Sequence, residues 1–378
     1  MPDSPLRQKI VRLIEATGPI SLAQYMHMCM ADPLHGYYAS RTAIGAGGDF
    51  ITSPQVSQMF GELVGIWCAA AWQAIGSPAR FVLAEAGSGL GTMMHDLLRA
   101  AATVPGFREA AMVRLIETSP AMIAAQRAKL ADLPFDIGWT QRLETLEDGP
   151  LVLVANEFLD VLPVRQFVRA GGIWRERCIG LSADGALASV LGPALADISL
   201  LPAGHESEPD GSVFEYAPAR EAWIETLAVR LAEGGGTALL IDYGHSQSGF
   251  GDTFQAMRAH APADPLADPG LADMTSHVDF AAIANAARSG GAWVSPVMTQ
   301  GDFLLAMGIA ERAGALGSGQ PSFEQENIRA AAERLVLPGE MGDLFKVIAL
   351  CSKRNASAMN GLPPYPVAPS SVGAPSGN

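Results

Sequence analysis

Between residues 81 and 156 the chain alternates short apolar runs with segments of helical periodicity. Strands are predicted for the apolar runs 81–86, 112–117, 134–139 and 151–156, and helices for 90–101 and 120–130. Strands that alternate with helices form parallel βαβ units, whose sheet is covered by helices on both faces. Because strands buried on both faces are apolar throughout, the pattern predicts a mostly parallel α/β sheet.

The segments on either side of this core predict different structures. Two short helices are expected between residues 6 and 31, broken at Gly18-Pro19 and restarted at Ser21, followed by a long helix at 55–75. Residues 164–200 carry short apolar stretches joined by Gly-Gly and Asp-Gly turns, a pattern typical of antiparallel strands. We therefore expect a helical cap at the N-terminus and a β-rich insertion into the α/β core.

The second half of the chain returns to the core pattern and then loses it. Helices are predicted at 219–232 and 277–291, and strands at 236–245 and 345–351. Residues 245–276 contain several Pro, Asp and Gly and almost no periodicity, which indicates a long loop, functional or disordered, that we expect to form part of the acceptor site. The tail from Asn355 is rich in Pro, Ser, Gly and Ala and is expected to be disordered.

These expectations divide the chain into five parts. They are an N-terminal helical cap and lid (1–78), a first half of the core (79–163), a β-rich insertion (164–215), a second half of the core (216–354) with a functional loop at 245–276, and a disordered tail (355–378). The insertion is set apart because its antiparallel pattern differs from the apolar runs before and after it.

Charge narrows the range of partners. The 25 basic and 39 acidic side chains give a formal net charge of −14. This charge argues against nucleic acid as a partner, because phosphate binding needs a basic surface. It favours a cationic substrate or a basic segment of a protein.

Cysteine content and hydropathy exclude further classes. The four cysteines form no CxxC pair, so neither a zinc site nor a disulfide framework is expected, and no other metal site is predicted. The N-terminus lacks the apolar stretch of a signal peptide. The longest uncharged run, 63–79, is short for a bilayer, so membrane insertion is not expected.

The sharpest motif is "LAEAGSGLGT", which places Glu85, Gly87, Gly89 and Gly91 at a junction between a strand and a helix. Glycine there lets the backbone approach a ligand, and the helix N-terminus offers unpaired N–H groups. A dinucleotide fingerprint would need glycine at position 92, where this chain has Thr92. The ExGxGxG form is the S-adenosylmethionine (SAM) version of this loop, with Glu85 facing the cationic amino group of the methionine moiety.

Glu117 ends the second predicted strand, where a carboxylate can accept hydrogen bonds from both ribose hydroxyls. The alternatives are a surface carboxylate or a first-turn acid of the next helix. Ser119 and Trp139 are candidates for the adenine pocket. A helix-capping serine and a core tryptophan explain these two residues equally well.

Three polar residues, Asn156, Glu157 and Asp160, follow the apolar strand 151–156. Ligands of open α/β sheets lie beyond the carboxyl ends of the strands, and the fourth strand is expected to end beside the first. Glu157 and Asp160 would share one face of a helical turn before Pro163 and could orient and deprotonate an amine or guanidinium. The alternative is Asn156 as a helix N-cap followed by first-turn acids.

Six blocks in order resemble the MidA family: "GDFITSPQVSQMFGELVG", "AEAGSGLGT", "LIETSP", "NEFLDVLPV", "LLIDYGH" and "DPLADPGLADMTSHVDF". The resemblance covers about residues 6 to 352 and implies a class I SAM-methyltransferase (Rossmann-like) fold with SAM as methyl donor. The family's mitochondrial member is a protein arginine methyltransferase that assists complex I assembly, which implies a protein arginine as acceptor. By motif, the cofactor residues are Glu85, Gly87, Gly89, Gly91, Glu117 and Ser119, and Asn156, Glu157 and Asp160 lie near the acceptor.

The same resemblance implies a cofactor lid at Asp49–Pro54 and a partner with a basic, arginine-containing segment, expected to be a complex I subunit. Because the chain shows no mitochondrial presequence, it looks like a bacterial, cytoplasmic member of the family. Two other functions stay open: a non-catalytic SAM-binding assembly factor and a SAM methyltransferase that acts on a small molecule. The methylation pattern and the oligomeric state are not predicted.

Overall fold

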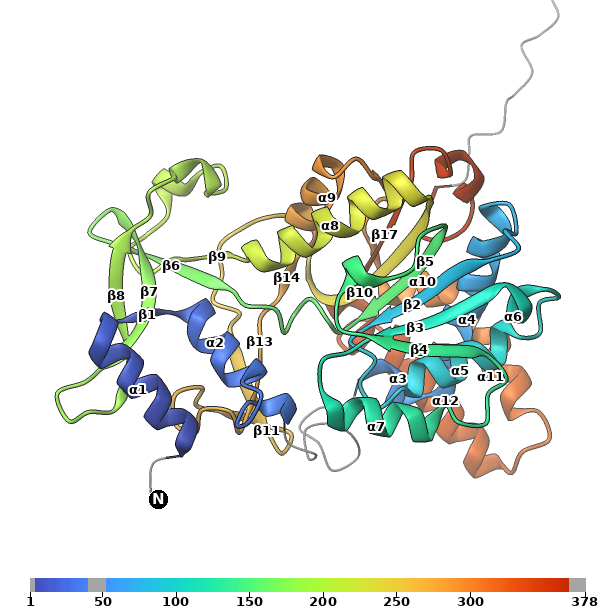
Figure 1. Cartoon of the computed structure of the whole chain (residues 1–378), viewed down its shortest axis with the longest axis horizontal. Coiled ribbons are helices and arrows are strands. Elements are labelled where there is room, and N and C mark those ends of the chain that lie inside the picture. Colours follow the sequence, from blue (N-terminus) through green and yellow to red (C-terminus); the bar gives the residue numbers. More distant parts are fainter. Residues whose placement is uncertain (1–3, 40–51, 367–378) are drawn as a thin grey trace, which may run out of the picture.

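The sheet expected from residues 81–156 is present and extends into the second half of the chain (Figure 1). The computed structural model describes residues 4–39 and 52–366. Its main sheet has the strand order β15-β17-β10-β5-β2-β3-β4. Their bounds are β2 (Phe81–Ala86), β3 (Ala111–Ile116), β4 (Asp136–Thr140), β5 (Leu151–Asn156), β10 (Gly236–His245), β15 (Trp293–Val294) and β17 (Phe345–Cys351). From β10 to β4 in this order, each strand is parallel to the next. β17 is antiparallel to β10.

Successive residues of the central strands face two different apolar layers, which explains why these strands are apolar throughout. Leu83 of β2 and Val152 of β5 face a layer that includes α4 (Gln58–Ala74) and α5 (Thr92–Ala101). Val82 and Leu153 face the opposite layer, which includes α8 (Pro218–Gly234) and α9 (Phe280–Ser289). The doubly covered sheet predicted from the sequence is therefore confirmed.

The β-rich segment forms a second, antiparallel sheet. It contains β6 (Arg165–Ala170), β7 (Ile173–Leu181), β8 (Leu187–Ala194) and β9 (Val213–Tyr216), joined at its edge by β1 (Ile20–Ser21). The two N-terminal helices α1 (Pro5–Thr17) and α2 (Leu22–Ala31) pack on this sheet, at the left of Figure 1. Residues 1–78 are thus not one cap, since α1 and α2 join the insertion whereas α4 covers the main sheet.

Two expectations for single elements were wrong. The helix expected at 55–75 is divided into α3 (Ser53–Val56) and α4, because Ser57 is extended with φ −161° and caps α4 with its side chain. The segment 245–276 is not an unstructured loop. It contains a three-stranded antiparallel sheet of β11 (Gln255–Arg258), β12 (Ala261–Ala263) and β13 (Asp273–Thr275). Its short strands carry Pro262 and charged residues, which hid the alternation.

The C-terminal part of the chain is more ordered than the sequence indicates. Four helices precede β17, namely α10 (Gln300–Ala306), α11 (Ile309–Gly317), α12 (Ser322–Val336) and α13 (Met341–Leu344). Disorder from Asn355 is wrong up to residue 366, because η5 (Ala356–Met359) follows and Tyr365 is buried against Trp293. Residues 367–378 lie outside the described part of the chain.

The remaining elements connect these layers. They are η1 (Tyr37–Ala39), α6 (Phe107–Ala110), α7 (Pro120–Lys129), η2 (Leu143–Thr145), η3 (Ile198–Leu200), η4 (His205–Ser207), β14 (Val278–Asp279) and β16 (Met298–Thr299). Within residues 4–39 and 52–366, no helix combines the length and apolar character that crossing a bilayer requires.

Candidate active site

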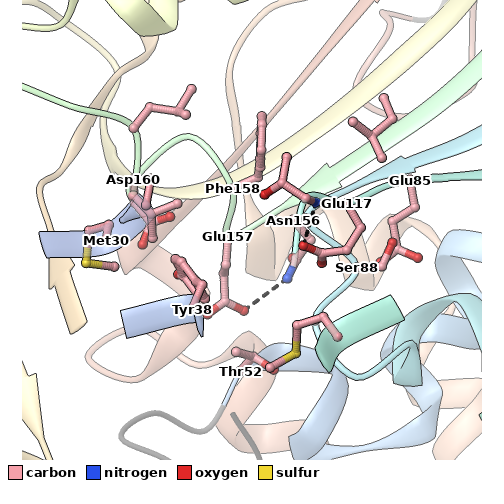
Figure 2. A pocket seen from close by; sticks show the side chains of 18 of the residues that line it. Met30, Tyr38, Thr52, Glu85, Ser88, Glu117, Asn156, Glu157, Phe158 and Asp160 are labelled. Atoms are coloured by element: carbon pink, nitrogen blue, oxygen red, sulfur yellow. Dashed lines mark hydrogen bonds between the residues drawn. The ribbon is translucent and has the colours of Figure 1, made fainter. Parts of the chain in front are cut away.

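A cavity of about 550 Å³ lies where the main sheet meets the N-terminal helices. The strands β2, β3, β5 and β10 reach it with their carboxyl ends, and α2 and β13 close its other side. Figure 2 shows Glu85 and Ser88 at one end, Met30, Tyr38 and Asp160 at the other, and Glu157 between them. We call these the glycine-loop end and the Asp160 end. The predicted lid, Asp49–Pro54, falls partly outside the described residues, but Thr52 and Pro54 line the cavity.

The glycine-loop end is formed by the turn between β2 and α5. Gly87 and Gly89 line the cavity with φ of +71° and +50°, a backbone region that favours glycine. A Cβ atom on Gly87 would lie 2.9 Å from the Phe158 ring, so the loop also packs closely on the segment after β5. Gly91 does not line the cavity; with φ +77° it is the N-cap of α5.

Two side chains of this end have unsatisfied polar atoms. Glu85 is 2% exposed, and its Oε2 has no hydrogen-bond partner. Burial raises the pKa of Glu85 to about 8, with a further contribution from the charge of Glu117. The hydroxyl of Ser88 is also buried; it interacts with the Glu85 carboxyl group, but it has no well-formed hydrogen bond. Burying polar groups without well-formed hydrogen bonds costs free energy. A polar ligand bound at this position would supply the missing hydrogen-bond partners.

Glu117 lies at the end of β3 on the wall of the same cavity. Its Oε1 accepts hydrogen bonds of 2.8 Å from the backbone N–H groups of Thr118 and Ser119, and its Oε2 accepts one of 3.2 Å from Gln126. The carboxylate is thus held in place but keeps acceptor capacity on Oε2. Burial raises the pKa of Glu117, despite these hydrogen bonds.

The buried amide of Gln126, a residue that sequence reasoning missed, connects three parts of this end. Its Nε2 donates to the carbonyl of Gly89 at 2.8 Å and to Glu117, and its Oε1 accepts a bond of 2.8 Å from Nε1 of Trp139. Trp139 therefore supports the amide and does not line the cavity. Ser119 is also outside the lining; its hydroxyl caps α7 and donates to the carbonyl of Tyr38. The contacts of Ser119 and Trp139 thus agree with the alternatives to an adenine pocket, a helix-capping serine and a structural tryptophan.

Glu157 follows β5 directly and has a left-handed backbone with φ +50°, so no helical turn carries it and Asp160. Non-glycine residues adopt this conformation rarely, and it turns the carboxylate toward the centre of the cavity (Figure 2). Its Oε1 accepts hydrogen bonds from the Ser53 backbone at 2.9 Å and from Asn156 Nδ2 at 3.0 Å. Burial raises the pKa of Glu157 to about 7.

Asp160 is 4% exposed and lies in the turn after Glu157. One of its carboxylate oxygens has no hydrogen-bond partner, and burial raises its pKa. Two buried groups behind this turn, Asp242 and Arg220, were not predicted from the sequence. Oδ2 of Asp242 accepts the N–H groups of Phe158, Leu159 and Asp160, and Arg220 donates to the Asp160 carbonyl at 3.0 Å.

The structure therefore brings most predicted site residues to one cavity. Its walls include Glu85, Gly87, Gly89, Glu117, Asn156, Glu157 and Asp160, whereas Gly91 and Ser119 stay behind the wall. The segment 245–276 contributes Asp273 and Thr275, and α8 contributes Trp223. Among the described residues, no group of three or more His, Cys, Asp or Glu side chains is arranged to hold a metal ion.

The glycine-loop end fits SAM in three respects. A buried carboxylate with a free oxygen, Glu85, can accept the cationic amino group, and the Ser88 hydroxyl can bind a polar atom of the methionine moiety. Glu117 keeps acceptor capacity for a ribose hydroxyl. The positive φ angles at Gly87 and Gly89 favour glycine, so the loop backbone lines the cavity without side chains at these two positions.

Comparison with known proteins gives consistent results. A family model described as "Putative S-adenosyl-L-methionine-dependent methyltransferase" matches residues 63–298. The chain is 37% identical to a Drosophila melanogaster protein named "Protein arginine methyltransferase NDUFAF7 homolog, mitochondrial", covering 91% of this chain and 83% of that protein. It is 33% identical to the Homo sapiens protein arginine methyltransferase NDUFAF7, covering 92% and 84%.

Solved structures include a similar fold with a bound ligand. A crystal structure from Burkholderia thailandensis bound to S-adenosyl-homocysteine has a TM-score of 0.79 and 27% identity, covering 92% of this chain and 91% of that chain. The curated relatives also correct one expectation. The predicted cytoplasmic location is wrong by this comparison, because these relatives are named as mitochondrial proteins.

Proposed function

Because the chain belongs to the family of SAM-dependent methyltransferases whose model matches residues 63–298, we propose that it transfers the methyl group of SAM to an arginine of a protein. The predicted family, the Rossmann-like fold and SAM as methyl donor are confirmed by the family match and the structural neighbour. The acceptor is our proposal. It is supported by the names of the relatives, which are protein arginine methyltransferases, and by the chemistry of the cavity.

The carboxylates beyond the glycine loop are the observation that carries this proposal. Glu157 lies between the two ends of the cavity, Asp160 and Tyr38 lie at its far end, and the aromatic side chain of Trp223 also lines it. Two carboxylates among aromatic rings suit a guanidinium, which combines charge-assisted hydrogen bonds with stacking on ring faces. A neutral acceptor would leave these buried acids without a cation.

SAM supplies an activated methyl group when it is bound, and the protein's task is to align and deprotonate the acceptor. Glu157 is placed to accept a hydrogen bond from the reacting nitrogen, since its carboxylate is fixed by Ser53 and Asn156. Its pKa of about 7 suits a general base near neutral pH, because it can take the proton that the nitrogen loses on methylation. Asp160 would hold the rest of the guanidinium and fix its orientation.

The acceptor arginine should lie in a basic, partly unfolded segment of a complex I subunit before its assembly. The net charge of −14 attracts such a segment and repels nucleic acid. Because the carboxylates lie inside a cavity, an arginine on a packed subunit could not reach them. Modification should therefore precede incorporation of the subunit into the complex.

The test is methyl transfer from labelled SAM to proteins of a complex I-containing organelle or cell extract, with this enzyme and with its Glu157→Gln variant. We expect label on one arginine of an unassembled subunit and none on the assembled complex. Label on a small molecule or on RNA would refute the protein acceptor. SAM binding by the wild type without any transfer would instead favour a non-catalytic assembly factor.

A further inference from the structure

We propose that the hydroxyls of Tyr243 and Thr275 form, with Asp160, the subsite that recognises the acceptor guanidinium, and that Arg220 and Asp242 hold this subsite rigid. The inference rests on the proposed arginine acceptor and deepens it. It assigns binding roles to Tyr243, at the end of β10, and to Thr275, at the end of β13. Neither residue belongs to the glycine loop or to the turn after β5.

Three buried polar atoms without well-formed hydrogen bonds indicate a ligand-binding position at the Asp160 end of the cavity. The Tyr243 hydroxyl, the Thr275 hydroxyl and Oδ1 of Asp160 are all buried, and the Tyr243 hydroxyl interacts with both Thr275 and Asp160, but none of the three atoms has a well-formed hydrogen bond. All three residues line the same cavity, and their exposures are 7%, 2% and 4%. Such atoms are rare in folded proteins, so three from separate chain segments facing one cavity indicate a missing polar partner.

Asp242 fixes two of the segments relative to each other. Its Oδ2 accepts the N–H groups of Phe158, Leu159 and Asp160 at 2.9 to 3.2 Å. Its Oδ1 accepts the N–H of Tyr243 at 2.9 Å. One fully buried carboxylate therefore sets the position of the Asp160 turn against the end of β10.

Arg220 fixes the third segment. Its Nη2 donates to the Asp160 carbonyl at 3.0 Å and to Oγ of Ser276, the neighbour of Thr275, at 2.6 Å. Its Nη1 donates to the His277 carbonyl at 2.7 Å, and the Ser276 N–H donates to the Asp160 carbonyl at 3.1 Å. A binding site whose supporting groups are locked in this way is preorganised, which lowers the entropic cost of binding.

The charged groups at the subsite are compatible with one bound cation. Asp160 and Asp242 are two buried carboxyl groups, and Arg220, 3% exposed, is the buried guanidinium beside them. No basic side chain of residues 4–39 and 52–366 forms an ion pair with either carboxyl group. Burial raises the pKa of both carboxyl groups, so a bound guanidinium would favour the ionised form of Asp160, and its five N–H donors can serve the carboxylate and both hydroxyls.

The subsite is tested with Tyr243→Phe and Thr275→Val, which remove one hydroxyl each with little change of shape. The probe is a lysine-rich peptide with one central arginine, methylated with labelled SAM. Each variant should raise the KM for the peptide about tenfold, since a hydrogen bond to a charged group is lost. Calorimetry should find the affinity for S-adenosyl-homocysteine unchanged, because the glycine-loop end is intact.

Matched control variants separate recognition from folding. Thr237 and Tyr365 are also buried, but their hydroxyls bond to each other at 3.0 Å, and Thr237 donates to the Leu350 carbonyl at 2.8 Å. Tyr365→Phe and Thr237→Val should therefore lower the melting temperature and leave the KM for the peptide unchanged. Tyr243→Phe and Thr275→Val should change the melting temperature less than the controls do, because their hydroxyls have no well-formed hydrogen bond.

Two results would overturn the subsite. One is an unchanged KM for the peptide in both cavity variants while the wild type methylates arginine, which refutes the subsite and leaves the proposed function intact. The other is a fall of melting temperature equal to that of the controls, which makes the hydroxyls structural. If the wild type methylates no arginine peptide but another acceptor, the proposed function fails first, and the guanidinium subsite fails with it.

Discussion

The backbone N–H of Ser53 donates a hydrogen bond of 2.9 Å to Oε1 of Glu157, which lies 104 positions further along the chain. Ser53 is fully buried, and its hydroxyl donates to Oε1 of Gln300 at 3.3 Å. Gln300 in turn donates to the Leu335 carbonyl in α12. The carboxylate at the centre of the cavity is thus held by the residue that begins α3, which the C-terminal helices hold in place.

A pair of variants isolates this N–H group. Ser53→Pro removes it at the first position of a helix, where proline is well tolerated, and Thr52 before it already has the extended backbone that proline requires. Ser53→Ala loses the same hydroxyl but keeps the N–H. Since a donor to the carboxylate favours its ionised form, the pH of half-maximal activity should rise by about one unit in Ser53→Pro only. A shift of equal size in both variants would contradict this role of the N–H group.

The pKa of Glu157, raised to about 7 by burial, predicts the pH dependence of activity. Methyl transfer should rise about tenfold per pH unit up to pH 7 and then level off, because only the ionised carboxylate accepts a proton. Glu157→Gln should slow single-turnover transfer on the order of 10²-fold and flatten this profile, with SAM affinity nearly unchanged. Asp160→Asn provides the comparison: its profile should keep the step, moved to lower pH, because the charge of Asp160 contributes to the raised pKa of Glu157. A step near pH 7 that persists in Glu157→Gln would show that another group is the base.

Glu85 should make the free enzyme less stable at high pH. Burial raises its pKa from the usual 4.5 to about 8, so the folded state holds the proton more tightly than the unfolded state. The resulting stabilisation is complete below pH 4.5 and is lost as the pH rises through 8. Glu85→Gln should therefore match the wild type near pH 4 and have the higher free energy of unfolding at pH 9. Denaturant unfolding at both pH values measures the difference, and equal stabilities at pH 9 would refute the shift.

Gln126 should affect cofactor binding but not the methyl-transfer step. Gln126→Leu removes the donor to Gly89 and Glu117, so both would be positioned less well for SAM. We expect the dissociation constant of SAM to rise about tenfold to a hundredfold, with kcat at saturating SAM nearly unchanged. Trp139→Phe is the control that keeps the amide but removes its support, and it should have a smaller effect. A fall in kcat with an unchanged dissociation constant would contradict this assignment.

The parts of the site that could be predicted are those with a local signal. The glycine loop and the polar residues after β5 were found because each follows an apolar strand directly, and parallel strands bring their carboxyl ends to one edge. The meeting of Glu85, Glu117 and Glu157 at one cavity follows from the order β5-β2-β3 alone.

The parts that were missed depend on contacts distant in sequence. Arg220 lies in the first turn of a helix and resembles a surface residue, yet its burial is compensated by carbonyls near residues 160 and 276. Gln126 looks like a polar position of α7 until its three partners from other elements are known. The φ of +50° at Glu157 could not be expected either, since glutamate rarely adopts it.

The cavity lies between two apolar clusters, which are also connected by the buried hydrogen bonds of Arg220 and Asp242. α1, α2 and the β13 strand pack in one cluster with part of the insertion, whereas the glycine loop rests on the layers around the main sheet. Cooperativity of unfolding depends on such shared contacts, and here much of the boundary is an open space of about 550 Å³. A methyl donor and an acceptor bound there would add contacts between the two sides of the cavity. The enzyme with both ligands is then expected to melt at a higher temperature and in a sharper transition than the free enzyme.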